Sequence, residues 1–254
     1  MNFQGEASPL TSSGCDAAAE MLGVGLAELW TVIRVETRGF GFLTDRRPQI
    51  LYERHVFHRL TKGRFRSDAP LVSNPKPGGY AGGQSEYARL SSALDLDREA
   101  ALSSTSWGVG QVMGYHAKSL GFDSAEHMAS EMTISEDRQL RSMVRFILEH
   151  RLHLPLRNRD WTKFARAYNG PGFAKNRYDE KLRHAHDDLT ANGLPDLDLR
   201  SAQLRLHYRG FHPGPVDGLI GNVTRGALRR FQQSEGLPVT GQLDLDTEAR
   251  LSLV

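Results

Sequence analysis

The sequence predicts a mainly α protein with two domains, a larger α+β domain followed by a small three-helix domain. The first 190 residues carry the pattern of successive helices. Residues 40–53 instead resemble two short strands around the turn "RRPQ", which predicts one small β-hairpin. The end of the chain contains an internal repeat, which predicts a separate folded module.

The composition is that of a globular protein. The chain has 254 residues, of which 39% are hydrophobic and 24% charged, and its net charge is +2. These values exclude a disordered or collagen-like chain. No apolar run is long enough for a transmembrane helix, and the N-terminus lacks the pattern of a signal peptide. Cys15 is the only cysteine, which excludes an internal disulfide and a multi-cysteine metal site.

Eight helices are expected in the first domain. They lie near residues 14–22, 26–37, 84–94, 97–104, 124–131, 134–150, 160–169 and 174–190. Thr133 and Glu136 have the spacing of a capping box for the longest helix. Gly170-Pro171 should end the helix at 160–169, and "SNPKPGGYAGG" (73–83) is expected to be a loop.

The repeat has an offset of 23 residues. The stretch "PVDGLIGNVTRGAL" (215–228) aligns without gaps to "PVTGQLDLDTEARL" (238–251), with Pro, Val, Gly, Thr and Leu coinciding. In each copy the glycine should adopt a backbone conformation that a β-carbon opposes, and Thr224 or Thr247 should cap a helix. Three short helices around one core are therefore expected, joined to the first domain by the turn-rich segment 191–198.

This module resembles the peptidoglycan-binding domain of bacterial and phage cell-wall hydrolases. The resemblance implies that the cell-wall-binding residues include Asp217, Gly218, Thr224, Phe231 and Gln232. The full set of matching positions is Gln203, Leu204, Gly210, Phe211, Val216, Asp217, Gly218, Gly221, Thr224, Ala227, Leu228, Phe231, Gln232, Gly236, Leu237, Gly241 and Thr247.

Three carboxylates between residues 34 and 55 are candidates for catalysis. Enzymes that cleave glycosidic bonds usually employ a pair of carboxylates, one of them an acid in partly apolar surroundings. Glu36 suits the acid, because it ends a core-bound helix, although a solvated helix-end glutamate is the alternative. Asp45 and Glu53 compete for the second role. Asp45 would reach across a cleft from the hairpin, whereas Glu53 could instead pair with Arg54 or Arg59 and organise the site.

Two further segments contain residues suited to the walls of a sugar-binding cleft. "SWGVGQ" and "AYNG" resemble segments of goose-type lysozymes and lytic transglycosylases. The amides of Gln111 and Asn169, the hydroxyl of Ser106 and the ring of Tyr168 could bind substrate sugars. The alternative is that Tyr168, like Trp107, is a core aromatic residue.

Residues 10–190 as a whole resemble the N-acetylmuramidase domain of phage endolysins, through "ETRGFGFLTD", "SWGVGQVMG" and "AYNGPG". The resemblance implies a lysozyme-like catalytic domain over 1–190, a linker over 191–198 and a peptidoglycan-binding domain over 199–254. It also implies that Glu36 is catalytic in cleaving β-1,4 bonds between N-acetylmuramic acid and N-acetylglucosamine. A lytic transglycosylase forming 1,6-anhydro products, or a non-catalytic wall-binding protein, are the alternatives.

The expected partner is peptidoglycan. Residues 46–66 contain seven Lys or Arg and one acid, Glu53, which indicates either a solvated face or a surface for an anionic polymer. No nucleic-acid motif accompanies this run, so nucleic acid is not an expected partner, and neither is stable membrane insertion. His55 and His58 lack further ligands, so no metal or other cofactor is expected. A monomer is expected, held in the host cytoplasm until another protein opens the membrane.

Overall fold

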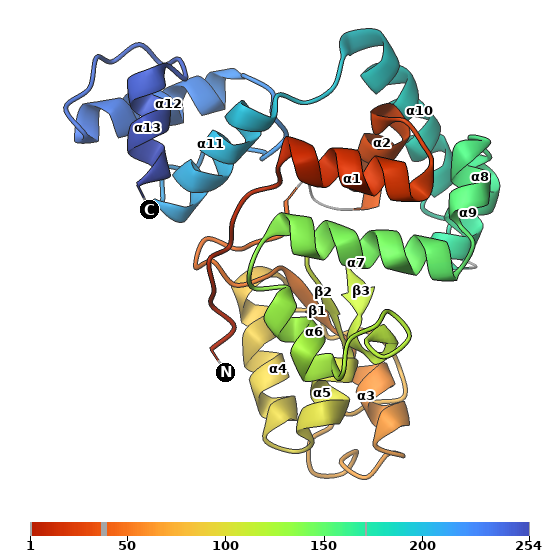
Figure 1. The fold of residues 1–254 in the computed structure, drawn as a ribbon. Coiled ribbons are helices and arrows are strands. Elements are labelled where there is room, and N and C mark those ends of the chain that lie inside the picture. The colour runs from red at the N-terminus through yellow and green to blue at the C-terminus, as the bar shows by residue number, and fades with distance from the viewer. Residues whose placement is uncertain (1, 37–39, 171, 254) are drawn as a thin grey trace.

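The computed structural model describes residues 2–36, with only the backbone of Glu36, and residues 40–170 and 172–253. Figure 1 shows α7 crossing the molecule between α1 and the small sheet, with α4, α5 and α6 beyond the sheet. The helices and strands of the first domain are α1 (Ser12–Leu22), α2 (Leu26–Glu36), β1 (Ile50–Tyr52), α3 (Arg54–Leu60), η1 (Gly83–Ser85), α4 (Glu86–Leu94), α5 (Arg98–Ser103), β2 (Thr105–Trp107), β3 (Val112–Met113), η2 (Gly114–His116), α6 (Ala125–Glu131), α7 (Glu136–Glu149), α8 (His153–Arg157), α9 (Trp161–Asn169) and α10 (Tyr178–Asn192). Those of the second domain are α11 (Leu197–Tyr208), α12 (Asn222–Ser234) and α13 (Leu245–Ser252).

The predicted fold class is confirmed, and the eight predicted helices are present, each within a few residues of its expected ends. Two short helices, α3 and α8, were not predicted. Within the described residues, no helix has both the length and the apolar character that crossing a membrane requires.

The sheet differs from the predicted hairpin. It has three antiparallel strands in the order β1-β2-β3, whereas the two expected arms of the hairpin share only the bridge between Phe42 and Pro48. The ladder stops there because the next pair of backbone groups is bonded elsewhere. The amide of Gly41 donates to Glu136 Oε1 at 2.7 Å, and the carbonyl of Gln49 accepts from the amide of Gly108 at 2.8 Å. The second arm therefore pairs with β2, where Leu51 lies opposite Ser106 and Ile50 opposite Trp107.

The predicted capping box at the start of α7 is wrong. Ser135 is the N-cap, and its side chain accepts from the amide of Arg138. The Thr133 hydroxyl donates to the carbonyl of Ser130, and Glu136 is fully buried rather than folded back over the helix end. Gly170 follows the last residue of α9, as predicted.

The predicted threonine caps of the repeat are also wrong. The N-caps are Gly221 for α12 and Asp244 for α13. Thr224 lies one turn further on, where its buried hydroxyl donates to the carbonyl of Pro213, and Thr247 donates to Asp244. Both threonines thus tie a helix to the loop before it, which a buried hydroxyl does well because it leaves no donor unpaired.

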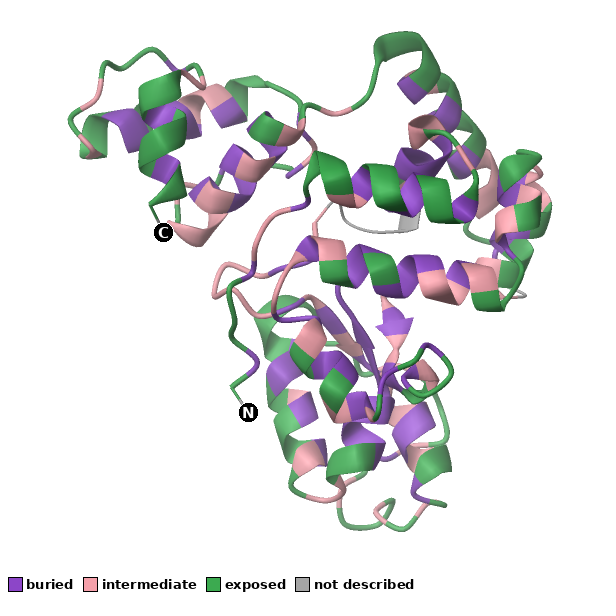
Figure 2. Ribbon diagram, in the orientation of Figure 1, coloured by how far each residue is buried: buried purple, intermediate pink, exposed green. Residues whose placement is uncertain are grey.

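The two domains have separate cores and also share a third one. The core of the second domain contains Ala202, Leu206, Ala227, Leu228, Phe231 and Leu251. At the junction, Ala7 and Phe42 of the first domain are buried with Leu204 and Val216 of the second. Figure 2 shows buried residues on α7 and on α11 alike. Residues 193–196 connect α10 to α11 and lie inside the predicted linker.

Candidate active site

A groove runs between the small sheet and the start of α10. Its volume is about 310 Å³, and its lining residues are Phe40, Gln49, Ile50, Leu51, Gly82, Gly83, Gly108, Val109, Gln111 and Tyr178. Glu53 follows Leu51 by two residues in extended backbone, so their side chains leave the chain on the same side. The wall that carries Leu51 therefore continues to the carboxylate of Glu53.

Glu36 is the last residue of α2, and its side chain lies outside the described residues. The helix itself packs against α10. Arg34 pairs with Asp188, and Val35 lies with Lys181 around one hollow, so the two helices run antiparallel. The Glu36 end of α2 therefore comes to the start of α10, where Tyr178 lines the groove.

Glu53 is mostly buried, and its carboxylate has no arginine partner among the described residues. The Tyr80 hydroxyl contacts both carboxylate oxygens, at 3.1 and 3.0 Å, and His55 Nδ1 lies 3.1 Å from Oε2. Arg54, which was considered as a partner of Glu53, donates instead to the carbonyls of Lys76 and Pro77. Burial, and after it the hydrogen bond to Glu53, raises the pKa of the Tyr80 hydroxyl, so Tyr80 remains a donor.

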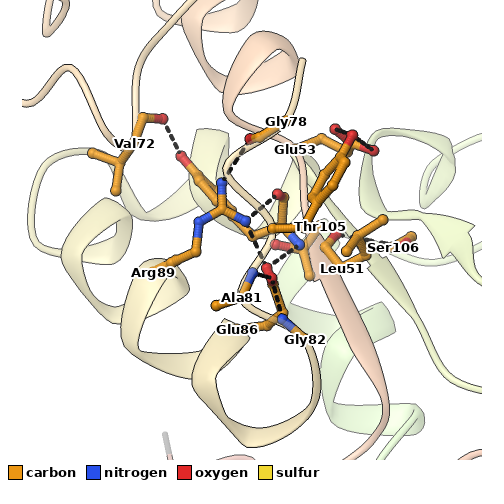
Figure 3. A network of polar contacts seen from close by, with 12 residues as sticks. Leu51, Glu53, Val72, Gly78, Ala81, Gly82, Glu86, Arg89, Thr105 and Ser106 are labelled. Atoms are coloured by element: carbon orange, nitrogen blue, oxygen red, sulfur yellow. Dashed lines mark hydrogen bonds and ion pairs between the residues drawn. The ribbon is translucent and has the colours of Figure 1, made fainter.

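The loop that carries Tyr80 is held by Glu86, a fully buried carboxylate at the start of α4 (Figure 3). It accepts hydrogen bonds from the amides of Tyr52, Ala81 and Gly82 and pairs with Arg89 at 2.7 Å. Burial acts to raise the pKa of the Glu86 carboxyl, but the three amides and Arg89 lower it by more, so it lies below its ordinary value.

Arg89 extends the same network. Its guanidinium donates to the carbonyl of Tyr52 at 3.0 Å and to that of Gly78 at 3.4 Å. Glu86 and Arg89 thus fasten the loop over residues 78–82 to strand β1, which leads directly into Glu53. The position of Tyr80 against Glu53 is a consequence of this fastening.

Asp45 is engaged in a local ion pair. Its Oδ1 accepts from the amide of Arg47 at 3.1 Å, and its Oδ2 pairs with the guanidinium of Arg47 at 2.6 Å. That guanidinium in turn lies over the ring of Tyr87, with Cζ 3.9 Å from the ring centroid. The arrangement closes the turn between Phe42 and Pro48, and it gives Asp45 a structural task.

Ser106 and Gln111 are joined to each other in the groove wall. Ser106 Oγ donates to Gln111 Oε1 at 2.9 Å, while Gln111 Nε2 donates to the carbonyls of Gly108 and Gln49. Gln111 lines the groove, but its amide is held in place by these bonds. The pair therefore shapes the wall and joins β2 to the turn before β3.

Tyr168 and Asn169 lie at the end of α9. The Tyr168 hydroxyl donates to the carbonyl of Gly110 at 3.0 Å, and its ring stacks on Phe164. Both residues are half-buried, and neither is part of the groove lining given by the described residues. Trp107 is almost completely buried, as its core alternative predicted.

The predicted wall-binding residues of the second domain include side chains with partners inside that domain. The Gln232 side chain is buried, donating to Thr240, Gln242 and Thr247 and accepting from the amide of Gly241. Gln203 on α11 does the same for the first copy, where its bonds reach Asp217, Gly218, Leu219 and Thr224. Phe231 is fully buried in the core. The helix before each copy of the repeat therefore supplies a glutamine that clamps the glycine turn of that copy.

Three residues of the site were missed from the sequence: Tyr80, which contacts Glu53, and the pair Glu86 and Arg89, which holds its loop. The sequence carries a signal for the pair. Their signal is an acid and a base three positions apart on a helix face that also carries the buried Leu90. Such a pair usually lies on the solvated face. Because this pair lies on the apolar face of α4, both side chains point into the protein and form buried polar contacts there.

Two family models match this chain. The family model for N-acetylmuramidase matches residues 25–190, and a model for a peptidoglycan binding domain matches residues 195–251. The chain belongs to the N-acetylmuramidase family.

One solved structure similar to this family member is that of a Burkholderia AP3 phage endolysin. It is 43% identical with a TM-score of 0.68, and the match covers 72% of this chain and 71% of that one. The spore cortex-lytic enzyme of Bacillus cereus is 46% identical over 65 residues, 26% of this chain and 25% of that enzyme. The localization factor PodJL of Caulobacter vibrioides is 36% identical over 63 residues, 25% of this chain and 6% of that protein. The chain thus matches a quarter or less of the length of these curated relatives. The N-acetylmuramidase match thus lies in the first domain, and the peptidoglycan binding domain match takes in the second.

Proposed function

We propose that this protein hydrolyses the β-1,4 bond between N-acetylmuramic acid and N-acetylglucosamine in peptidoglycan and thereby lyses bacteria. The observation that carries the proposal is the environment of Glu53. It is a carboxylate that continues the wall of a groove, accepts the hydrogen bond of the Tyr80 hydroxyl and has no arginine partner among the described residues. The helix that ends at Glu36 packs on α10 and runs toward its start, where Tyr178 lines the same groove. Two carboxylates around a groove suit glycoside hydrolysis.

Glu36 is the general acid in this proposal, and Glu53 is the second carboxylate. Glu36 delivers a proton to the leaving oxygen, a step typically worth ~10²–10⁴-fold in rate. Glu53 stabilises the cationic centre or activates water, with the Tyr80 hydroxyl fixing its orientation. Asp45 supports the site indirectly, because Arg47 already satisfies its carboxylate.

The second domain, residues 199–254, holds the enzyme on the wall, and residues 191–198 link it to the catalytic domain over 1–190. The protein acts as a monomer, without nucleic acid. It remains in the host cytoplasm until a membrane lesion made by another protein gives it access to the wall. The similarity to a phage endolysin supports this route.

The test compares three amide variants in a turbidity assay on purified cell walls, with melting temperatures measured in parallel. Glu36→Gln and Glu53→Gln should each lower the rate by orders of magnitude while the protein remains folded. Asp45→Asn should retain most of the activity but melt at a lower temperature. Near-normal activity of a folded Glu53→Gln variant, together with loss of activity in Asp45→Asn, would reverse the two assignments.

A further inference from the structure

The junction between the two domains contains a fully buried ion pair. Arg200 lies on α11 of the second domain, and Glu136 is the first residue of α7 in the first domain. The two guanidinium Nη atoms lie 2.6 and 2.9 Å from the two carboxylate oxygens, and neither side chain is exposed. A buried pair of this kind depends on both members, since removing one leaves a charge in a place that water does not reach.

The same carboxylate also holds two backbone segments of the first domain. Glu136 Oε2 accepts from the amide of Leu10 at 2.9 Å, and Oε1 accepts from the amide of Gly41 at 2.7 Å. Each oxygen therefore has one partner from Arg200 and one from the backbone. Hydrogen bonds to a charged acceptor are among the stronger ones, so both segments are firmly fixed.

Gly41 belongs to the segment that follows Glu36 and leads into the groove. One turn along α7, Gln139 Nε2 donates to the Gly41 carbonyl at 3.3 Å, and Gln139 Oε1 accepts from the amide of Val109 at 2.8 Å. Val109 lines the groove, as does Phe40, the neighbour of Gly41. The fit is close, because a β-carbon at Gly41 would lie 1.8 Å from Gln139 Oε1.

The second domain covers this segment directly as well, mainly through α11. The ring of Phe40 meets that of His207 edge-on at 5.3 Å, and Phe42 is buried against Leu204 and Val216. Further along, the Tyr208 hydroxyl donates to the carbonyl of Ala7 at 2.8 Å. The second domain thus packs directly against residues 40–42.

We infer that Arg200 is a positioning residue for catalysis, acting through Glu136 on the Gly41 segment, so that the wall-binding domain completes the active site besides attaching the enzyme to its substrate. The inference rests on the proposed function. Without Arg200, Glu136 is a buried charge with no cation, and the anchor of Gly41 loosens. Small displacements near reacting groups can lower a rate by as much as ~10²-fold.

The test uses the full-length protein and short, soluble, uncrosslinked peptidoglycan strands, for which attachment to an insoluble wall brings no advantage. The variants are Arg200→Met, Glu136→Gln and the two combined, assayed well below their melting temperatures. Arg200→Met should lower kcat about tenfold or more with little change in KM. The double variant should recover about threefold of that loss and stay about threefold below wild type. It buries no unpaired charge, and the introduced glutamine can still accept from the amide of Gly41, but its NH₂ group then faces the amide of Leu10.

Tyr208→Phe is the matched control. It removes a hydrogen bond across the same junction but leaves Glu136 paired, so its kcat should stay within about twofold of wild type. A folded Arg200→Met variant with wild-type kcat would overturn the inference. If Arg200→Met does not fold, the double variant decides: kcat about threefold or more below wild type supports the inference, and wild-type kcat contradicts it.

Hydrogen exchange separates this inference from the proposed function. Peptides covering residues 40–49 should exchange faster in Arg200→Met, or in the double variant, than in wild type or Tyr208→Phe. Unchanged exchange there would contradict the positioning role even if the protein had a different activity. Failure of the wild-type protein to cleave the strands would contradict only the proposed function.

Discussion

Replacing Glu86 by glutamine should both destabilise the protein and lower its kcat. The carboxylate is fully buried and accepts from the amides of Tyr52, Ala81 and Gly82 while it pairs with Arg89. Glutamine has the same shape, but its NH₂ group would face backbone donors, and Arg89 would lose its counter-charge. The loop over residues 78–82 would then be free to move away from β1.

The magnitude follows from the loss of one member of a buried pair, which costs roughly 3–5 kcal/mol. For a chain of this length, 1 kcal/mol corresponds to about 2–4 °C in melting temperature, so the expected decrease is roughly 6–20 °C. Because the same loop places Tyr80 on Glu53, kcat should fall even at temperatures where the variant is folded.

The assay is thermal unfolding of wild type and Glu86→Gln at several pH values. The pKa of Glu86 is lowered in the folded protein, so its ionised form contributes stability above the ordinary carboxyl pKa. That contribution is lost as the pH falls through the lowered value. The difference in melting temperature between wild type and variant should therefore be largest near pH 7 and decrease on acidification.

The matched control is Glu126→Gln. Glu126 pairs with Arg98 on the surface, where both side chains are more than 40% exposed. Such pairs contribute at most about 1 kcal/mol, so its melting temperature should change by no more than about 4 °C. The reasoning would be refuted if Glu86→Gln had the same melting temperature as Glu126→Gln at pH 7. It would also be refuted if the difference in melting temperature between wild type and Glu86→Gln increased in acid.

Three other changes test separate parts of the account. Tyr80→Phe removes the hydroxyl that contacts both oxygens of Glu53 and should lower kcat several-fold with little effect on melting temperature. Unchanged kinetics would count against Tyr80 as the residue that orients Glu53. Asp45→Asn should lower the melting temperature by a few degrees and leave most of the activity, as measured by calorimetry and turbidity. Gln232→Leu leaves the amide of Gly241 without an acceptor and should lower the stability of the second domain by about 1–3 kcal/mol. The expected result is weaker sedimentation with purified walls; full sedimentation with an unchanged melting curve would contradict the role of Gln232 as a clamp.

Helices could be predicted from the sequence because their signals are local. Apolar spacing and flanking glycines fixed α1, α2 and α9 within a few residues. The hairpin could not be predicted, because the partners of Gly41 and Gln49 are Glu136 and Gly108, which are distant in sequence. Local pattern cannot show which of two available strands a backbone group will bond.

Several residues of the candidate site could be named from the sequence, but how they are arranged around the groove could not. The short stretch that holds Asp45 and Glu53 was recognisable as a candidate, but the sequence did not distinguish the two carboxylates. In the structure Arg47 forms an ion pair with Asp45, and the Tyr80 hydroxyl contacts Glu53 because Glu86, distant in sequence, holds its loop. The same limit applied between the domains. A repeat with its own core predicts an independent module, whereas the burial of Arg200 against Glu136 joins that module to the first domain.

The most direct test of the proposed function is mass spectrometry of the fragments that the wild-type protein releases from purified peptidoglycan. If Glu36 and Glu53 together hydrolyse the β-1,4 bond, every new glycan end should be a reducing N-acetylmuramic acid, and Glu53→Gln should release almost none. Fragments ending in 1,6-anhydro-muramic acid, or in reducing N-acetylglucosamine, would contradict the account.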